Sequence, residues 1–313
     1  MDPVVVVGAG ISGIAAARAL GAGGREVVVL DRGRRIGGRM ASRRTDGRVV
    51  DTGASYFTIS DDRFEAVVER WRSRGLARPW TDTLMVAHDG DLEPKPGPVR
   101  WAAPGGLRSL VEDLAVGLDV REAAVERVGP GPTVDGLPAV AVVLAMPDPQ
   151  AVRLLDPAYA SLATTLDDPF DPVLALTATW PERCWPDVDG AFVAGDAVLD
   201  WVADDGRRRG DGAPVLVAHS TSSFAAEHLA EPDDAADAMA VALRDVLGIA
   251  TEPSSTHVQR WTFGKPTGSR EERFALDDSL VGVCGDAFSD RPRVEAAYLS
   301  GRSLGEALLA RLA

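Results

Sequence analysis

Short apolar runs alternate with glycine-rich turns at the start of the chain. Val4–Val7 is an unbroken run of β-branched residues, which is typical of a strand buried on both faces. Residues 14–20 are apolar and rich in alanine, which predicts a helix that begins inside the glycine-rich segment 8–13 and stops at the glycines of residues 21–24. Residues 26–30 are apolar after Glu26 and are typical of a second buried strand. The pattern therefore predicts a strand, a helix and a second strand in succession.

The rest of the chain carries two kinds of pattern. Residues 104–118 present leucine and valine at helical spacing, residues 139–145 and 280–284 are buried-strand runs, and a final helix is expected to open near residues 293–301. Between these segments lie strand-like runs at residues 173–180, 190–194, 214–219 and 257–263. One amphipathic helix is expected at residues 232–247. We therefore expect an α/β fold in which a Rossmann-type domain is interrupted by an α+β domain built on a mostly antiparallel sheet.

Composition narrows the class of protein. The chain has 313 residues, of which 45% are hydrophobic and 26% charged, and this excludes a wholly disordered chain. The formal net charge of −14 argues against nucleic acid or an anionic membrane as a main partner. Cys184 and Cys284 are too isolated for a disulfide framework or a zinc site. No signal peptide or membrane-length apolar run is seen, so we expect a cytoplasmic location.

The charge is distributed unevenly. Residues 1–48 hold nine Arg, no Lys and four acidic residues, so this block carries +5 and the remainder −19. The block coincides with the glycine-rich turns. We therefore expect it to serve a small bound polyanion.

The first turn has the pattern of a dinucleotide-binding motif. Gly8 permits a tight turn, Gly10 lets the backbone approach a pyrophosphate, and Gly13 lets the helix pack closely on the strand. The N-terminus of the helix offers free N–H groups to phosphate, and Asp31 after the second strand can accept from a ribose hydroxyl. The alternative is a glycine-rich turn in an ordinary α/β domain. Strand, helix and acid in register favour dinucleotide binding.

A second glycine-rich segment follows Asp31. It includes Gly38, Arg39 and Met40, and its glycines would allow a second close approach to the pyrophosphate while Arg39 adds a charge-assisted hydrogen bond. The alternative is a solvated basic loop. Another strand pattern then runs into a turn at residues 53–55.

These motifs carry a family resemblance. The glycine motif, Asp31, the Gly-Gly-Arg ending at Arg39 and the Asp-x-Gly-Ala of residues 51–54 resemble the FAD-dependent amine oxidase and desaturase superfamily. Within it, residues 53–58, 101–106, 199–203, 217–219, 260–263 and 293–301 make the chain similar to the renalase-like flavoenzymes. The resemblance implies non-covalent FAD, with residues 53–55 near the isoalloxazine ring.

The resemblance also implies a set of cofactor contacts. Asp286 would accept from flavin ribityl hydroxyls, although it could instead only cap its loop, and the helix that opens near Val294 would stabilise negative charge on the reduced flavin. The full set comprises Gly8, Gly10, Ile11, Ser12, Gly13, Asp31, Arg32, Gly38, Arg39, Met40, Gly53, Ala54, Ser55, Val125, Ala145, Met146, Gly285, Asp286, Arg293, Val294 and Ala297. The expected FAD domain comprises residues 1–76, 104–156 and 278–313, and the substrate domain residues 77–103 and 157–277.

The implied reaction is hydride transfer from a small donor, such as a dihydronicotinamide isomer, to flavin N5, with O2 as acceptor and H2O2 as product. Two alternatives stay open: an FAD-dependent amine oxidase or desaturase of another small metabolite, and a flavin-binding module without turnover. No metal site is expected, and the protein would be a monomer or homodimer whose partner is a small-molecule substrate. The candidate catalytic residues are His219, Tyr56, Trp201 and Trp261.

The substrate side departs from the resemblance. Ser55 stands where the renalase-like proteins usually have Gln, Gln259 where they have His, and the loop 204–210 is unlike theirs. The two lysines, Lys95 and Lys265, match no lysine context of the amine oxidases. The cofactor is therefore predicted more firmly than the substrate.

Overall fold

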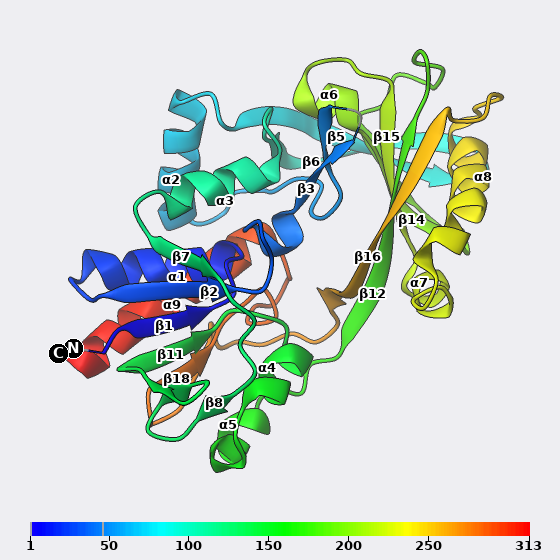
Figure 1. Ribbon diagram of the computed structural model, residues 1–313. Coiled ribbons are helices and arrows are strands. Elements are labelled where there is room, and N and C mark those ends of the chain that lie inside the picture. The colour runs from blue at the N-terminus through cyan, green and yellow to red at the C-terminus, as the bar shows by residue number, and fades with distance from the viewer. Residues whose placement is uncertain (1, 46) are drawn as a thin grey trace.

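The chain folds into two units, each built around one large sheet. The computed structural model describes residues 2–45 and 47–313 (Figure 1). The first unit has a six-stranded sheet in the order β17-β18-β11-β1-β2-β7, parallel except for β17. Its strands are β1 (Val4–Val7), β2 (Val27–Asp31), β7 (Asp119–Glu122), β11 (Ala141–Leu144), β17 (Ala275–Leu276) and β18 (Val281–Val283).

Strand β1 is buried on both faces, as its continuous apolar run predicts. Val4 and Val6 pack into a core with helices α1 (Ile11–Ala22) and α9 (Val294–Leu312), which lie together on one face of the sheet (Figure 1). Val5 and Val7 pack into a second core on the other face. The remaining helices of this unit are α2 (Asp62–Ser73), α3 (Leu107–Ala115), α4 (Asp148–Leu154), η2 (Pro157–Tyr159) and α5 (Ala160–Ala163).

The second unit is a seven-stranded sheet in the order β16-β12-β15-β14-β13-β5-β6. Neighbouring strands are antiparallel except for the parallel pair β13–β5. The strands are β5 (Arg78–His88), β6 (Asp91–Ala102), β12 (Phe170–Thr179), β13 (Gly190–Val193), β14 (Leu199–Asp204), β15 (Val215–Ser220) and β16 (Ser255–Pro266). Helix α8 (Ala236–Leu247) covers one face over a core that includes Leu174, Leu176 and Ala218, and α7 (Ser222–Glu227) adjoins it.

The uncovered face of this sheet carries the candidate substrate residues. His219 on β15 lies directly opposite Trp201 on β14, and Ala175 on β12 lies opposite both His219 and Gln259. Directly opposed residues in antiparallel strands point to the same face. Trp201, His219 and Gln259 therefore share the face that α8 leaves open.

The remaining elements are short. They are η1 (Gly38–Met40), β3 (Ser42–Thr45), β4 (Arg48–Asp51), β8 (Val128–Gly129), β9 (Thr133–Val134), β10 (Leu137–Pro138), α6 (Asp205–Arg209) and η3 (Pro232–Ala235). Of these, β8–β10 pack on the first unit, and α6 and η3 contact the second. In the described part of the chain, no helix is both long and apolar enough to cross a membrane.

The α/β fold with an inserted antiparallel sheet is confirmed, but two domain borders shift. Tyr159 and Leu162 pack in the core of the first unit, so the substrate unit begins after them and not at residue 157. Ala275–Leu276 pairs with β18, so the first unit resumes before residue 278. Both differences arise because short connecting segments carry no periodicity that shows which core they join.

Candidate flavin site

The glycine turn has the geometry that a bound pyrophosphate requires. Gly8 has a φ of +106°, and a Cβ there would lie 2.4 Å from the carbonyl oxygen of Ala145. A Cβ at Gly13 would lie 1.9 Å from the Gly8 carbonyl oxygen, so the helix packs directly on the turn. A Cβ at Gly10 would meet only the Cα of Gly38, at 3.9 Å, so this backbone is open to a ligand.

Helix α1 begins at this turn with its first N–H groups available to an anion. Gly10 is the N-cap residue and offers no side chain, and the first turn of α1 contains no acidic residue. Ile11 and Ser12 open the helix and are buried. These features fit the phosphates of a dinucleotide.

Asp31 lies at the end of β2, beside the glycine turn. One carboxylate oxygen accepts from the Ala9 N–H at 2.6 Å and the other accepts from the Gly33 N–H at 2.7 Å. The carboxylate thus links the two glycine-rich turns, a role that the sequence did not indicate. Each oxygen can accept a further hydrogen bond, so the predicted ribose contact fits this geometry.

Arg39 and Asp286 form an ion pair across the site. The Arg39 guanidinium donates to both carboxylate oxygens of Asp286, at 2.5 Å and 2.8 Å, and also to the Gly264 carbonyl at 3.3 Å. Sequence reasoning assigned the two residues separately, to pyrophosphate and to ribityl. The structure brings them together from positions 247 residues apart.

The loop after β4 packs against the Arg39 backbone. The Ala54 N–H donates to the Arg39 carbonyl at 2.8 Å, and a Cβ at Gly53 would lie 2.0 Å from that same oxygen. Gly53 is therefore required for close packing. The three residues 53–55 lie beside η1, so the structure brings the two glycine-rich segments of the predicted site together.

The two candidate tryptophans donate to this loop. The indole N–H of Trp261 donates to the Thr52 carbonyl at 2.6 Å, and that of Trp201 donates to the Ser55 hydroxyl at 2.9 Å. The Trp201 ring also contacts Tyr56, with ring centroids 5.7 Å apart. Their polar atoms thus hold the loop, which the sequence analysis did not foresee when it assigned these rings to the substrate.

Tyr56 and His219 present neutral polar groups beside these rings. Burial raises the pKa of Tyr56, opposed by the nearby Arg100 guanidinium. Burial, with the charges of Lys265 and Arg208, lowers the pKa of His219 to about 3, and its Nε2 is buried without a partner among the described residues. Both side chains are therefore uncharged near neutral pH.

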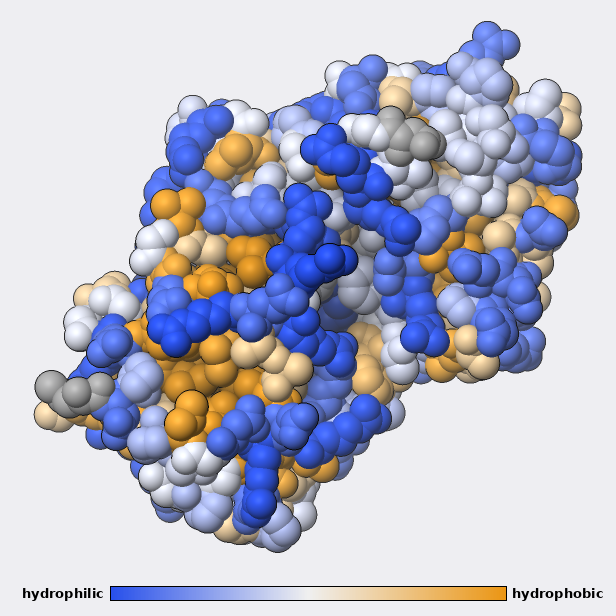
Figure 2. Space-filling view, viewed as in Figure 1, coloured by the Kyte–Doolittle hydropathy of each residue, from blue (hydrophilic) through white to orange (hydrophobic). Residues whose placement is uncertain are grey.

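The remaining predicted contacts differ in burial. The Gly285 N–H donates to the Ser300 hydroxyl at 3.0 Å, and a Cβ at Gly285 would meet Met146 only at its carbonyl oxygen, 3.9 Å away. Met40, Ala145 and Ala297 are buried, Val125 is partly buried, and Arg32 is exposed. Residues along the furrow between the two units are hydrophilic (Figure 2).

The N-terminus of α9 contains a residue that sequence reasoning missed. Arg293 is its N-cap residue, and Val294 opens the helix. Glu295 is fully buried in the first turn, where its carboxylate accepts from the N–H groups of Ser60 and Asp61 at 2.6 Å and 2.9 Å. This carboxylate lies at the positive end of the α9 dipole, the position that the resemblance assigns to negative charge on the flavin.

The arginines of the basic N-terminal block have different surroundings. Arg39 lies at the site, but Arg18 donates to the Leu114 carbonyl, Arg25 to the Leu312 carbonyl, and Arg48 to Asp205 and Asp211. Three of the nine arginines thus connect separate elements. Five others are exposed: Arg32, Arg34, Arg35, Arg43 and Arg44.

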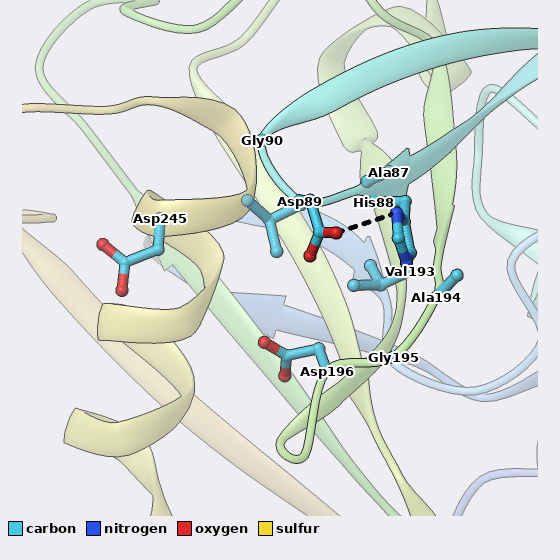
Figure 3. A pocket seen from close by; sticks show the side chains of 10 residues that line it. Ala87, His88, Asp89, Gly90, Val193, Ala194, Gly195, Asp196 and Asp245 are labelled. Carbon is cyan, nitrogen blue, oxygen red and sulfur yellow. Dashed lines mark ion pairs between the residues drawn. The ribbon is translucent and has the colours of Figure 1, made fainter.

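A separate pocket of about 210 Å³ lies at the ends of β5 and β13, beside α8 (Figure 3). His88, Asp89, Asp196 and Asp245 line it, and His88 Nδ1 lies 3.3 Å from Asp89. None of the predicted site residues belongs to it. Among the described residues, no group of His, Cys, Asp and Glu is arranged to hold a metal ion.

Comparison with known proteins supports a flavin site. The profile of the family described as "Flavin containing amine oxidoreductase" matches residues 71–303, and that of an "NAD(P)-binding Rossmann-like domain" matches residues 6–71. The chain belongs to the flavin-containing amine oxidoreductase family. The name of this family describes flavin-containing oxidoreductases, and membership implies a flavin cofactor, FAD.

Individual relatives match over part of their length. Putrescine oxidase of Kocuria rosea is 42% identical over 110 residues, which cover 35% of this chain and 22% of that protein. Phytoene dehydrogenase of Streptomyces griseus is 44% identical over 77 residues, which cover 24% of this chain and 15% of that protein. These matches span less than a quarter of the relatives, and none of them concerns the renalase-like subgroup.

Solved structures match over the whole chain. Cyclohexylamine oxidase from Brevibacterium oxydans has a TM-score of 0.76 at 17% identity, and putrescine oxidase bound to putrescine has 0.73 at 18%. Each comparison covers 99% of both chains. At this identity the likeness shows the fold alone.

Proposed function

We propose that the protein binds FAD non-covalently between its two units and oxidises a small donor by hydride removal. The observation that carries this proposal is the contact of Arg39 with Asp286 beside the open turn at Gly10. A cation and a carboxylate in one place, next to an uncapped helix N-terminus, suit a ligand with both phosphates and hydroxyl groups.

Different residues would bind different parts of the cofactor. The N–H groups at the start of α1 and the Arg39 guanidinium would bind the phosphates, and Asp31 would accept from the ribose. Asp286 would exchange part of its contact with Arg39 for the ribityl hydroxyls, while residues 53–55 would line the ring. FAD, when bound, would supply a hydride acceptor at N5.

The state of the two cysteines supports non-covalent binding. Burial raises the pKa of Cys284 to about 12, so this residue stays a thiol and not the reactive thiolate. Cys184 is exposed and makes its contact with Thr251 in the other unit. Neither cysteine is therefore a reactive thiolate at the proposed site.

The substrate side provides rings and neutral polar groups. Trp201, Tyr56 and His219 would orient the donor and exclude water, and such positioning supplies much of the rate in hydride transfer. The family match favours a donor of the amine oxidase or desaturase kind over a dihydronicotinamide isomer. The latter remains the donor that the renalase-like resemblance implies.

Anaerobic mixing of the FAD-loaded protein with a panel of donors tests the proposal. The panel comprises diamines, cyclic amines and dihydronicotinamide isomers, and the readout is loss of the flavin absorption band. Fast bleaching by an amine supports the family-type activity, and bleaching only by a dihydronicotinamide supports the renalase-type donor. A flavin that no donor reduces would support a module without turnover. A protein that takes up no FAD would overturn the proposal as a whole.

A further inference from the structure

We propose that Arg208 is a positioning residue that sets the conformation of the loop formed by residues 51–55. Its guanidinium Nη1 donates to the Ser55 carbonyl at 3.1 Å, and Nη2 lies 3.4 Å from the Asp51 carbonyl. The side chain is 1% exposed. The consequence for the flavin rests on the proposed function, in which residues 53–55 line the ring.

Helix α6 is short, and specific interactions fix both of its ends. Asp204 caps it by accepting from the Arg207 N–H at 2.8 Å, and Gly210 ends it with a φ of +84°. A Cβ at Gly206 would lie 2.1 Å from the Ala213 carbonyl oxygen, so the helix is pressed against the chain that leads into β15. This short helix directs Arg208 and Arg209 inward.

Two buried carboxylates fix the two arginines. Asp205 accepts from Arg208 at 2.5 Å and from Arg209 at 3.1 Å, and Arg209 also lies 3.1 Å from Asp51. Arg48 adds a contact with Asp205 at 2.7 Å. Buried charges are tolerated only when they are paired, so this cluster has little freedom to rearrange.

The cluster is close to electrically balanced. Burial raises the pKa of Asp205, but the charges of Arg208, Arg209 and Arg48 outweigh burial and lower it below the usual value. Asp51 and Asp205 carry two negative charges against three arginines, of which Arg48 also contacts the more exposed Asp211. Removing Arg208 therefore leaves each buried carboxylate with a cationic partner, because Arg209 still contacts both Asp51 and Asp205.

Arg208 fixes the direction of one peptide unit. In a trans peptide the carbonyl and the following N–H point to opposite sides. Because the Ser55 carbonyl faces Arg208, the Tyr56 N–H is directed away from the cluster. A side chain of the substrate unit thereby sets the orientation of a backbone in the predicted flavin site.

The sequence contains a matched control for this residue. Arg207 lies next to Arg208 on α6, but its guanidinium contacts Asp187 and Asp189 and is about one-third exposed. Arg207→Met removes the same charge from the same helix without touching the loop. Arg208→Lys keeps the charge but cannot donate to two carbonyls with a rigid fork.

Amide hydrogen exchange over residues 52–56 in the protein without FAD provides the first readout. We expect exchange to be about tenfold faster in Arg208→Met, as loss of one charged hydrogen bond implies, with Arg207→Met unchanged and Arg208→Lys in between. Exchange in α8, in the other core of the second unit, serves as an internal reference. A general loss of structure would accelerate α8 as well, whereas a positioning role would not.

The flavin provides the second readout. With FAD bound, Arg208→Met should shift the flavin absorption band and raise the FAD dissociation constant about tenfold, and Arg207→Met should change neither. Unchanged exchange and an unchanged flavin spectrum in Arg208→Met would overturn the proposal. If Arg208→Met does not fold, the same comparison is made with Arg208→Lys, and wild-type exchange and spectrum there would overturn it too. If the protein takes up no FAD, the proposed function fails, while the exchange comparison still decides whether Arg208 holds the loop.

Discussion

Arg39 and Asp286 are the residues on which cofactor binding depends most. We expect Arg39→Ala to weaken FAD binding about tenfold or more, because it removes a charge-assisted bond to phosphate and leaves the Asp286 carboxylate without its partner. Asp286→Ala should also weaken binding, through loss of a hydroxyl acceptor. FAD content after gel filtration and fluorescence titration would measure both.

Arg34→Ala is the control for these variants, since Arg34 is an exposed member of the same basic block. Full FAD occupancy in both Arg39→Ala and Asp286→Ala would show that the site has been assigned to the wrong residues.

His219 should make the protein sensitive to acid. Its pKa falls from 6.5 to about 3 on folding, so the unfolded chain binds the extra proton first as pH decreases. The stability that its neutral form contributes is present above pH 6.5 and is lost toward pH 3, by up to about 1.4 kcal/mol per pH unit. Urea unfolding of His219→Gln at several pH values should show a shallower decline than wild type.

The exposed His88 provides the comparison for this experiment, because His88→Gln should follow the wild-type curve. If His219→Gln also follows it, His219 is not held in its neutral form by the fold.

At the scale of elements, helices α1 and α9 pack so closely that position 301 must be a glycine. A Cβ at Gly301 would lie 1.8 Å from the Ser12 carbonyl oxygen, so Gly301→Ala forces the two helices apart. We expect it to destabilise the protein by about 1–3 kcal/mol. Thermal unfolding would measure this.

Gly21→Ala is the matched substitution within α1. Nothing lies within 4 Å of a Cβ at that position, so helix propensity alone should stabilise the protein by about 0.5–1 kcal/mol. Equal effects of the two substitutions would contradict the proposed close packing.

Elements with strong local patterns could be predicted from the sequence. The run Val4–Val7, the glycine turn and α1 each carry their own signal, and the structure places them as expected. Strand β6 carries none, because Pro94, Pro96 and Pro98 suggest a loop. It forms nevertheless as an edge strand, where missing N–H groups cost little.

The site could be predicted only in part, because some of its contacts join residues far apart in the sequence. Gly8, Gly10 and Asp31 belong to one short motif, whereas the contact of Arg39 with Asp286 depends on tertiary folding. The consecutive arginines 207–209 resemble a solvated surface run, and nothing in their spacing shows that two of them are buried. Such residues are found only when the surrounding carboxylates are seen in space.

At the scale of the whole molecule, FAD should stabilise both units together. A ligand that binds only the folded state adds about 2.7 kcal/mol at a concentration 100 times its dissociation constant. The Tm should therefore rise by a few degrees and continue to rise with FAD concentration. Calorimetry would measure it.

Riboflavin, which lacks the phosphates and the adenosine, should raise the Tm far less at the same concentration. An equal rise with riboflavin would contradict the assignment of Arg39 and the α1 N-terminus to phosphate binding.

The discontinuous first sheet has a consequence for biosynthesis. Strand β18 and helix α9 are contributed by residues 281–312, yet they flank β11 and α1 from the first half of the chain. Until they leave the ribosome, β11 remains an unprotected sheet edge and the small-residue face of α1 stays exposed to solvent. The nascent chain is therefore exposed to aggregation while the inserted unit is being synthesised. We expect chaperones that bind nascent chains to assist its folding.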